Sequence, residues 1–313
     1  MVKVRKMSKN GEIKNMKMRK TLEIYYKKWY NMTWNYNNMR ESEKMKVNFI
    51  NRTLLKEFFC VFSAINLIIT TVLIFIEIPE NKKWITFLVF AVAMVIIYVF
   101  LLIRANTIKS IKLNINGSTL EIKEGDIFNE SGLKVISFNE YFDTIVDNKI
   151  IAENTLNGKF IKEYVEDVDE LDRIINEKLT PICIDENRSE GKKNKYDLGV
   201  ILEYRDFLLT AFSKFDENNR ANLTLKEYLQ FLMNFWNNLD IIYANRNVNI
   251  TVFGGGITRF TDLSYISDQE LLESIIWTFR TSRIKFTYPS KISIIIPKGK
   301  MEKINLYKIK EMF

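Results

Sequence analysis

Histidine is absent from this chain of 313 residues, and cysteine occurs only twice. The lack of histidine excludes an imidazole general acid or base, a histidine metal ligand and a histidine-activated nucleophile. Two cysteines, Cys60 and Cys183, do not make a disulfide framework. We expect both to be small buried apolar residues in a reducing compartment, and we expect no metal, no cofactor and no catalytic residue.

Charge is nearly missing from two long stretches. Residues 58–78 read FFCVFSAINLIITTVLIFIEI, with Glu77 as the one acid, and residues 84–103 read WITFLVFAVAMVIIYVFLLI, with none. A helix needs about 20 apolar residues to cross the hydrocarbon core of a bilayer. With PENKK as the turn between them, the two stretches predict a helical hairpin that crosses a membrane and returns. Two buried helices of a soluble domain are the alternative, but such helices are usually shorter and keep a polar face.

Basic residues flank both ends of the predicted hairpin, which indicates that both ends lie in the cytoplasm. They are Lys44, Lys46, Arg52 and Lys56 before it, and Arg104, Lys109 and Lys112 after it. In the turn, Lys82 and Lys83 are offset by Glu77 and Glu80.

Residues 1–55 are basic and rich in aromatics, and they contribute much of the net charge of +8. One interpretation is a helix on the inner leaflet, with Tyr25, Tyr26, Trp29, Tyr30 and Trp34 at the lipid headgroups. A stacking surface for single-stranded nucleic acid and a poorly ordered tail are the alternatives. The neighbouring apolar stretches favour lipid over nucleic acid, which we do not expect as a partner.

Polar residues recur along the first apolar stretch at heptad spacing: Lys56, Ser63, Asn66, Thr70 and Glu77. On a helix these residues share one face. Polar groups within lipid usually face a bundle interior or a wet cavity. The stripe therefore predicts either assembly with other copies of the chain or hydrogen bonds across the hairpin.

From residue 108 onward, the pattern changes to short strands and helices. Expected strands are 108–115, 119–123, 133–138, 199–204, 207–212, 249–253 and 291–296, with helices over 168–178, from Thr224 to about Tyr243, and from Ser267 to about Phe279. Thr224 with Glu227, and Ser267 with Glu270, have the spacing of capping boxes. This alternation predicts an α/β domain with a mixed, largely covered sheet.

Two short motifs follow predicted strands of this domain. Gly254, Gly255 and Gly256 allow a backbone to approach a phosphate, although such a turn can also be structural. No Gly-Lys-Ser/Thr follows, so this is not a Walker motif. In the other half of the domain, Gly125-Asp126-Ile127 places an acid that can accept from an adenine amino group, or that closes an Asx turn. Macro domains hold ADP-ribose with this pair of motifs.

Three segments together resemble the macro-domain effectors of type II Thoeris anti-phage defence, the ThsA family. They are EGDIFNESGLKVISFNEYFDTIVDNKII (124–151), FDENNRANLTLKEYLQFLMNFW (215–236) and GGGITRF (254–260). The resemblance covers residues 55–313. It implies a transmembrane hairpin (56–104) and a macro domain (105–313), and the basic N-terminal segment (1–55) that precedes them is predicted from composition alone.

The family resemblance also implies a function. A partner TIR enzyme makes a NAD-derived, histidine-linked ADP-ribose signal, which the macro domain binds. The chain then oligomerises and disrupts the bacterial inner membrane, which leads to abortive infection. The residues that we expect to serve this assembly, from the heptad spacing of the polar stripe, are Ser63, Asn66, Thr70 and Glu77.

Ligand-binding residues are carried over from the same resemblance. They are Gly125, Asp126 and Ile127 for adenosine; Asn139, Phe142 and Asp143 for the ligand wall; and Gly254, Gly255, Gly256, Ile257, Thr258, Arg259 and Phe260 for the diphosphate. The family's loop usually has Thr or Ser where this chain has Gly255, so a hydroxyl contact is missing here.

Two other functions stay open from the sequence. Some macro domains hydrolyse ADP-ribose, and Asn139 and Asp143 lie where such enzymes carry an asparagine-rich run and an acid. A membrane-tethered module that recruits an ADP-ribosylated protein is the other alternative. Oligomeric state separates this last function from an effector, because a tether need not assemble on ligand.

Overall fold

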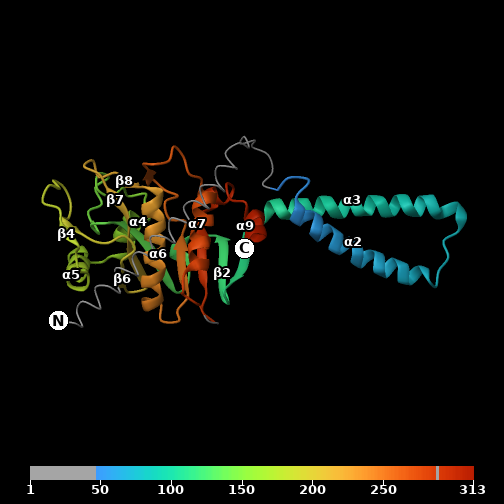
Figure 1. Cartoon of the computed structure of the whole chain (residues 1–313), viewed down its shortest axis with the longest axis horizontal. Helices are drawn as coiled ribbons and strands as arrows, with labels where there is room; N and C mark the ends of the chain where they lie inside the picture. Colours follow the sequence, from blue (N-terminus) through green and yellow to red (C-terminus); the bar gives the residue numbers. More distant parts are fainter. Residues whose placement is uncertain (1–46, 287–288) are drawn as a thin grey trace, which may run out of the picture.

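The computed structural model describes residues 47–286 and 289–313. The described chain forms a long helical hairpin that projects from one end of an α/β domain (Figure 1). The predicted surface helix with Tyr25 to Trp34 lies outside the described residues. The α/β fold with a mixed sheet is confirmed.

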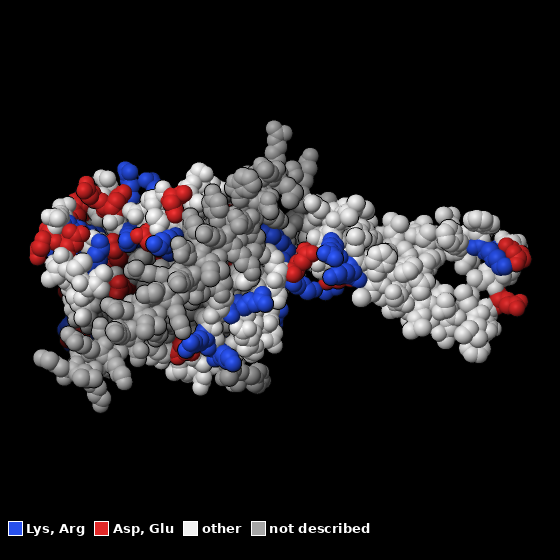
Figure 2. Space-filling view, viewed as in Figure 1, with Lys and Arg blue, Asp and Glu red and all other residues white. Residues whose placement is uncertain are grey.

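The hairpin consists of α2 (Arg52–Leu73), a short 3-10 turn (Glu80–Lys82) and α3 (Lys83–Thr107). Asn51 caps α2, since its side chain accepts from the backbone amides of Thr53 and Leu54. By length and composition, both helices are apolar enough to cross a membrane. Most of their side chains are exposed, and the hairpin surface between its tip and its base is free of charge on the face shown (Figure 2).

The polar stripe is shorter than predicted. Helix α2 ends at Leu73, so Glu77 lies in the extended segment that follows and does not share the helix face. The Asn66 amide donates to the Phe62 carbonyl (3.0 Å), and the Thr70 hydroxyl donates to the Asn66 carbonyl (2.7 Å). Each of these two side chains therefore donates a hydrogen bond within its own helix.

Both cysteines are exposed, which corrects the expectation that they are buried. Cys60 lies on the outer surface of α2, where the hairpin has no further layer to cover it. Cys183 lies in β4 (Cys183–Ile184), which pairs only with the two-residue strand β5 (Asn194–Lys195) in a small separate sheet.

The domain is organised around one large sheet with the order β1-β2-β11-β9-β3-β7-β8-β10, and β6 also pairs with β7. Its strands are β1 (Ser110–Ile115), β2 (Ser118–Glu124), β3 (Leu133–Asn139), β6 (Ile201–Tyr204), β7 (Phe207–Phe215), β8 (Ala221–Leu223), β9 (Val248–Thr251), β10 (Arg259–Phe260) and β11 (Ile292–Ile296). The five strands from β2 to β7 are parallel, and β1 and β6 pair antiparallel with their neighbours.

The predicted hairpin at the start of the domain is confirmed. Asn116 and Gly117 connect β1 to β2 with φ of 53° and 82°. A two-residue turn with both φ positive matches the right-handed twist of the paired strands. In β1, exposed and buried residues alternate, as expected for an edge strand with one covered face.

Helices cover both faces of the sheet. Successive residues of a strand point to opposite faces, so neighbours in one strand pack against different helices. Val135 and Leu208 pack on one face with α6 (Leu225–Ile242) and α7 (Asp268–Thr281), whereas Ile136 and Leu209 pack on the other. Helices α4 (Leu156–Tyr164) and α5 (Val168–Lys178) cover that second face. Both predicted capping boxes are present at the starts of α6 and α7.

The C-terminal residues form two short helices, α8 (Lys298–Met301) and α9 (Leu306–Met312). Helix α9 lies where the hairpin meets the domain (Figure 1). Neither helix is predicted by the sequence pattern, because each is too short to show a period.

Candidate functional site

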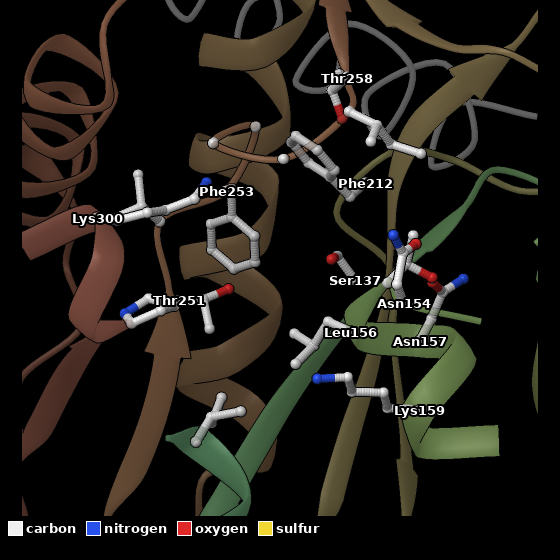
Figure 3. A pocket seen from close by; sticks show the side chains of 18 of the residues that line it. Ser137, Asn154, Leu156, Asn157, Lys159, Phe212, Thr251, Phe253, Thr258 and Lys300 are labelled. Atoms are coloured by element: carbon white, nitrogen blue, oxygen red, sulfur yellow. The ribbon is translucent and has the colours of Figure 1, made fainter. Parts of the chain in front are cut away.

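A cavity of about 700 Å³ opens at the carboxyl ends of the parallel strands. Its walls come from the ends of β2, β3, β9 and β11, from the start of α4, and from α8 (Figure 3). This edge of the sheet collects the loops that follow each parallel strand. Residues that are far apart in the sequence therefore meet here.

The glycine turn forms one side of the cavity. Gly254 has φ of 83°, which side chains rarely adopt, and a Cβ there would lie 3.4 Å from the Phe260 ring. At Gly255, a Cβ would lie 2.6 Å from the Asp268 Oδ1 and 3.2 Å from the Lys300 Nζ. A threonine or serine at residue 255 would therefore require the Asp268 carboxylate to move, and the Lys300 ammonium to give way slightly.

The Gly125-Asp126-Ile127 motif lies on another wall of the same cavity. The Gly125 amide donates to the Ile296 carbonyl (3.0 Å), which ties the end of β2 to the end of β11. Asp126 Oδ1 accepts from the Phe128 amide (3.1 Å), so the Asx turn is present. The Asx-turn interpretation of this motif is therefore confirmed, and Asp126 also lines the cavity.

Nine of the thirteen predicted ligand residues line this cavity. They are Gly125, Asp126, Ile127, Asn139, Gly254, Gly255, Gly256, Ile257 and Thr258. The other four, Phe142, Asp143, Arg259 and Phe260, do not line it.

Phe142 and Asp143 were predicted as ligand wall and instead lie in the interior. Asp143 is fully buried and accepts from the Arg188 guanidinium (2.6 and 3.2 Å) and from the Lys192 amide (2.8 Å). The Asn139 amide donates to Asp143 (2.7 Å). Phe142 is also fully buried and stacks on Phe138. Asn139 thus lines the cavity, and the buried Asp143 fixes its side chain by accepting its hydrogen bond.

Arg259 and Phe260 form β10, which pairs with β8. The Arg259 side chain is exposed at this edge of the sheet. Phe260 packs edge-on against Tyr228 (5.5 Å between ring centroids), behind Gly254. Phe260 therefore supports the glycine turn and does not face the cavity.

Sequence reasoning missed several polar residues of the cavity. They are Ser137, Asn154, Thr155, Asn157, Lys159, Thr251, Asp268, Lys298 and Lys300. Asn154, Asn157 and Lys159 lie on the side opposite Lys300 (Figure 3). One signal was available for the two C-terminal lysines, since Pro297 directly follows a buried strand. None was available for α4, whose Gly158 is required because a Cβ there would lie 2.3 Å from the Ala152 carbonyl oxygen.

Buried ionisable groups lie just behind the cavity wall, next to Asn139. Burial raises the pKa of Glu140, although Lys195 and the Phe215 amide act to lower it. Burial lowers the pKa of Lys192, while Asp172 and Asp143 act to raise it. Both groups are paired, with Lys195 3.3 Å from Glu140 and Lys192 2.6 Å from Asp172. These pairs order the loops behind the site.

Comparison with known proteins identifies the domain. Residues 120–297 match the family model described as Thoeris protein ThsA, Macro domain. The chain is 41% identical over 251 residues to the Thoeris protein ThsA of Bacillus amyloliquefaciens (strain Y2), which covers 78% of this chain and 84% of the relative. This chain belongs to the ThsA family.

The match to the ThsA macro-domain model begins within β2 and ends just after β11, so it includes both motifs of the cavity. Among solved structures, the Oceanobacillus iheyensis macrodomain with ADP has 14% identity and a TM-score of 0.41, covering 65% of this chain and 96% of that one. A variant of the same macrodomain with ADPR has 15% identity and a TM-score of 0.38, covering 65% and 98%.

Proposed function

We propose that the macro domain binds an ADP-ribose-type, NAD-derived signal, histidine-linked and made by a partner TIR enzyme. The observation that carries this proposal is the placement of two motifs on walls of one cavity. Gly254–Gly256 offers backbone to a diphosphate, and Asp126 offers an acceptor to an adenine. The volume of about 700 Å³ is in the range of small-molecule sites. Membership of the ThsA family supports the same ligand class.

The hairpin anchors the chain in the bacterial inner membrane, with both termini in the cytoplasm. Exposed apolar side chains along α2 and α3, such as Leu67, Phe87 and Ile96, support this part of the proposal. An apolar surface of this extent requires a lipid or protein partner. Ligand binding then drives oligomerisation and membrane disruption, which ends in abortive infection.

The domain acts as a receptor and not as an ADP-ribose hydrolase. A hydrolase needs an acid that positions water at the ligand. Asp143, the acid considered for that role, is bound by Arg188 and Lys192 and does not line the cavity. The Asn139 side chain is also engaged, since Oδ1 accepts from the Tyr141 amide (3.0 Å).

Calorimetry on the full chain in lipid nanodiscs tests the ligand. The titrants are ADP-ribose, NAD, AMP and a histidine-linked ADP-ribose. We expect the two ADP-ribose compounds to bind and AMP to bind more weakly, because AMP lacks the diphosphate. Equal affinity for all four compounds, or binding of none, contradicts the proposal. Release of free ADP-ribose from the linked compound in the same sample indicates hydrolysis.

A further inference from the structure

Lys300 lies against the glycine turn that the proposed function assigns to a diphosphate. Its Nζ is 3.8 Å from Asp268 Oδ2, and it would lie 3.2 Å from a Cβ at Gly255. The lysine reaches toward the loop that follows Phe253 (Figure 3). A lysine ammonium is a strong point-charge partner for phosphate. Lys300 is therefore placed to share its charge between Asp268 and an anion on the glycine turn.

We infer that the C-terminal segment 297–313 is the ligand sensor of this protein. In it, Lys300 binds the diphosphate of the ligand, and α9 passes the resulting change to the hairpin. The inference rests on the proposed function, because it takes the same ligand at the same cavity.

The segment runs without interruption from the cavity to the hairpin. Lys298 and Lys300 in α8 line the cavity, and so does Ile304 in the link that follows. Ile304 is buried, and the next residue, Asn305, caps α9 by accepting from the Lys308 amide (2.9 Å). A displacement of α8 therefore reaches α9 through this short, packed connection.

Helix α7 holds the same segment on its other side. The Gln269 side chain accepts from the Asn305 amide (2.8 Å), and Glu273 accepts from the Lys308 ammonium (2.7 Å). Asp268, the partner of Lys300, is the first residue of α7. A ligand that draws Lys300 away from Asp268 thus changes how α8 and α7 are joined at the cavity.

At the far end, α9 packs directly on the base of the hairpin. Tyr307 is buried with Leu54 of α2 and with Leu101, Leu102 and Ala105 of α3. Among the described residues, Tyr307 is the one member of this cluster that belongs to the macro domain. Lys310 forms an ion pair with Glu57 of α2 (3.0 Å).

This arrangement couples two sites by contact. A ligand shifts a conformational balance only through its different affinity for the two states. Lys300 supplies that difference, because its pairing changes when an anion binds on the glycine turn. Packed side chains transmit such a change because they repack between discrete arrangements and do not deform continuously.

The first experiment tests the cavity end, by calorimetry of the full chain in nanodiscs with ADP-ribose. Lys300→Met should weaken binding by about tenfold or more, the loss expected for a charge-assisted contact to phosphate. Lys303→Met is the matched control, because Lys303 is an exposed lysine just beyond α8 that does not line the cavity. Equal affinities of the two variants for ADP-ribose overturn the role of Lys300.

The second experiment tests the hairpin end with Tyr307→Ala. Dye release from liposomes is measured with and without ADP-ribose, and the ratio of the two rates should fall towards one, while the affinity of the Tyr307→Ala chain for ADP-ribose stays within about twofold of the parent value. Tyr243→Ala is the control, since Tyr243 is a buried tyrosine that belongs to the main core and not to the hairpin cluster. A ratio that is unchanged in Tyr307→Ala, or equally lost in Tyr243→Ala, overturns the coupling.

A third measurement needs no ligand. Backbone hydrogen exchange over 298–304 should be about tenfold faster in Tyr307→Ala than in the parent chain, because α9 no longer anchors the segment. Tyr243→Ala should leave that exchange near the parent rate, and equal rates in all three proteins overturn the inference. Failure of the parent chain to bind ADP-ribose is a different result, because it contradicts the proposed function and leaves the exchange comparison to decide the coupling.

Discussion

At the scale of single residues, the three glycines of the turn differ in how much room each leaves for a side chain. Gly254 has a positive φ that side chains rarely adopt, and a side chain at Gly255 would displace the Asp268 carboxylate, so substitutions at either position disturb their surroundings. A Cβ at Gly256 meets no atom within 4 Å. Gly256 is therefore the position where charge can be changed without strain.

We expect Gly256→Asp to weaken ADP-ribose binding by about 3 kcal/mol or more, roughly a hundredfold, because an anion is placed where the diphosphate is proposed to lie. Gly256→Asn is the control of the same shape without the charge, and it should retain most of the affinity. Calorimetry measures both. Normal binding by Gly256→Asp would show that the glycine turn is structural only.

Asp143 provides a prediction about stability. Asp143→Ala leaves Arg188 buried without its carboxylate, and the loss of one partner of a buried ion pair costs about 3–5 kcal/mol. Arg188 is 8% exposed in its side chain and Asp143 is 0% exposed. Thermal unfolding of the solubilised chain should show the loss, and Asp143→Leu combined with Arg188→Met should recover part of it. A change below about 1 kcal/mol would contradict this account.

At the scale of elements, the long helices of the hairpin contrast with the short strands of the β4–β5 sheet. Helices α2 and α3 are long and apolar, so their formation follows from the local sequence. The small sheet of β4 and β5 has two residues in each strand, and its Cys183 is exposed. That exposed thiol is useful, since it reports on the side of the membrane where the macro domain lies.

Labelling with a membrane-impermeant maleimide tests the proposed topology. In a Cys60→Ser background, a cysteine at the exposed position Asn81 should react from outside intact cells, because residue 81 lies in the turn between the two helices. Cys183 should react only after lysis. The reverse pattern of labelling contradicts a cytoplasmic macro domain.

The polar stripe on α2 provides a prediction at the same scale. Asn66 and Thr70 already bond within their helix, so what they offer a neighbouring copy is their remaining hydrogen-bonding capacity. Contacts of this kind contribute about 1 kcal/mol each between membrane helices. Asn66→Leu should therefore leave ADP-ribose affinity intact and weaken ligand-induced assembly, as measured by crosslinking and dye release in liposomes. If assembly is unchanged in both Asn66→Leu and Thr70→Leu, the stripe serves hairpin packing only.

At the scale of the whole molecule, the described residues of the hairpin meet the domain at a small junction. The ligand cavity opens at one edge of the sheet, and the hairpin base rests on α9 (Figure 1). In the described part of the chain, the hairpin contacts the domain at α9 and through the direct connection from α3 to β1. The C-terminal segment links the cavity to this junction, and its buried residues Met301, Ile304 and Tyr307 pack it in place.

The sequence by itself determined the features that depend on local patterns. Apolar length predicts the two long helices, and capping residues and period-2 alternation predict α6, α7 and the hairpin of β1 and β2. The glycine turn and Gly125-Asp126-Ile127 stand out because glycine lets the backbone turn tightly or approach a ligand directly after a strand. In each case, neighbours in the chain carry the signal.

Only the tertiary structure decided which residues share the cavity. Asp143 and Phe142 lie close to Asn139 in the chain, yet one is bound by Arg188 and the other enters the core. The Asp268 and Lys300 side chains reach Gly255 from other parts of the sequence and take up the space beside it. Helix α9 meets the hairpin only after the whole domain has folded. Such contacts depend on strand order and packing, for which the local sequence carries no pattern.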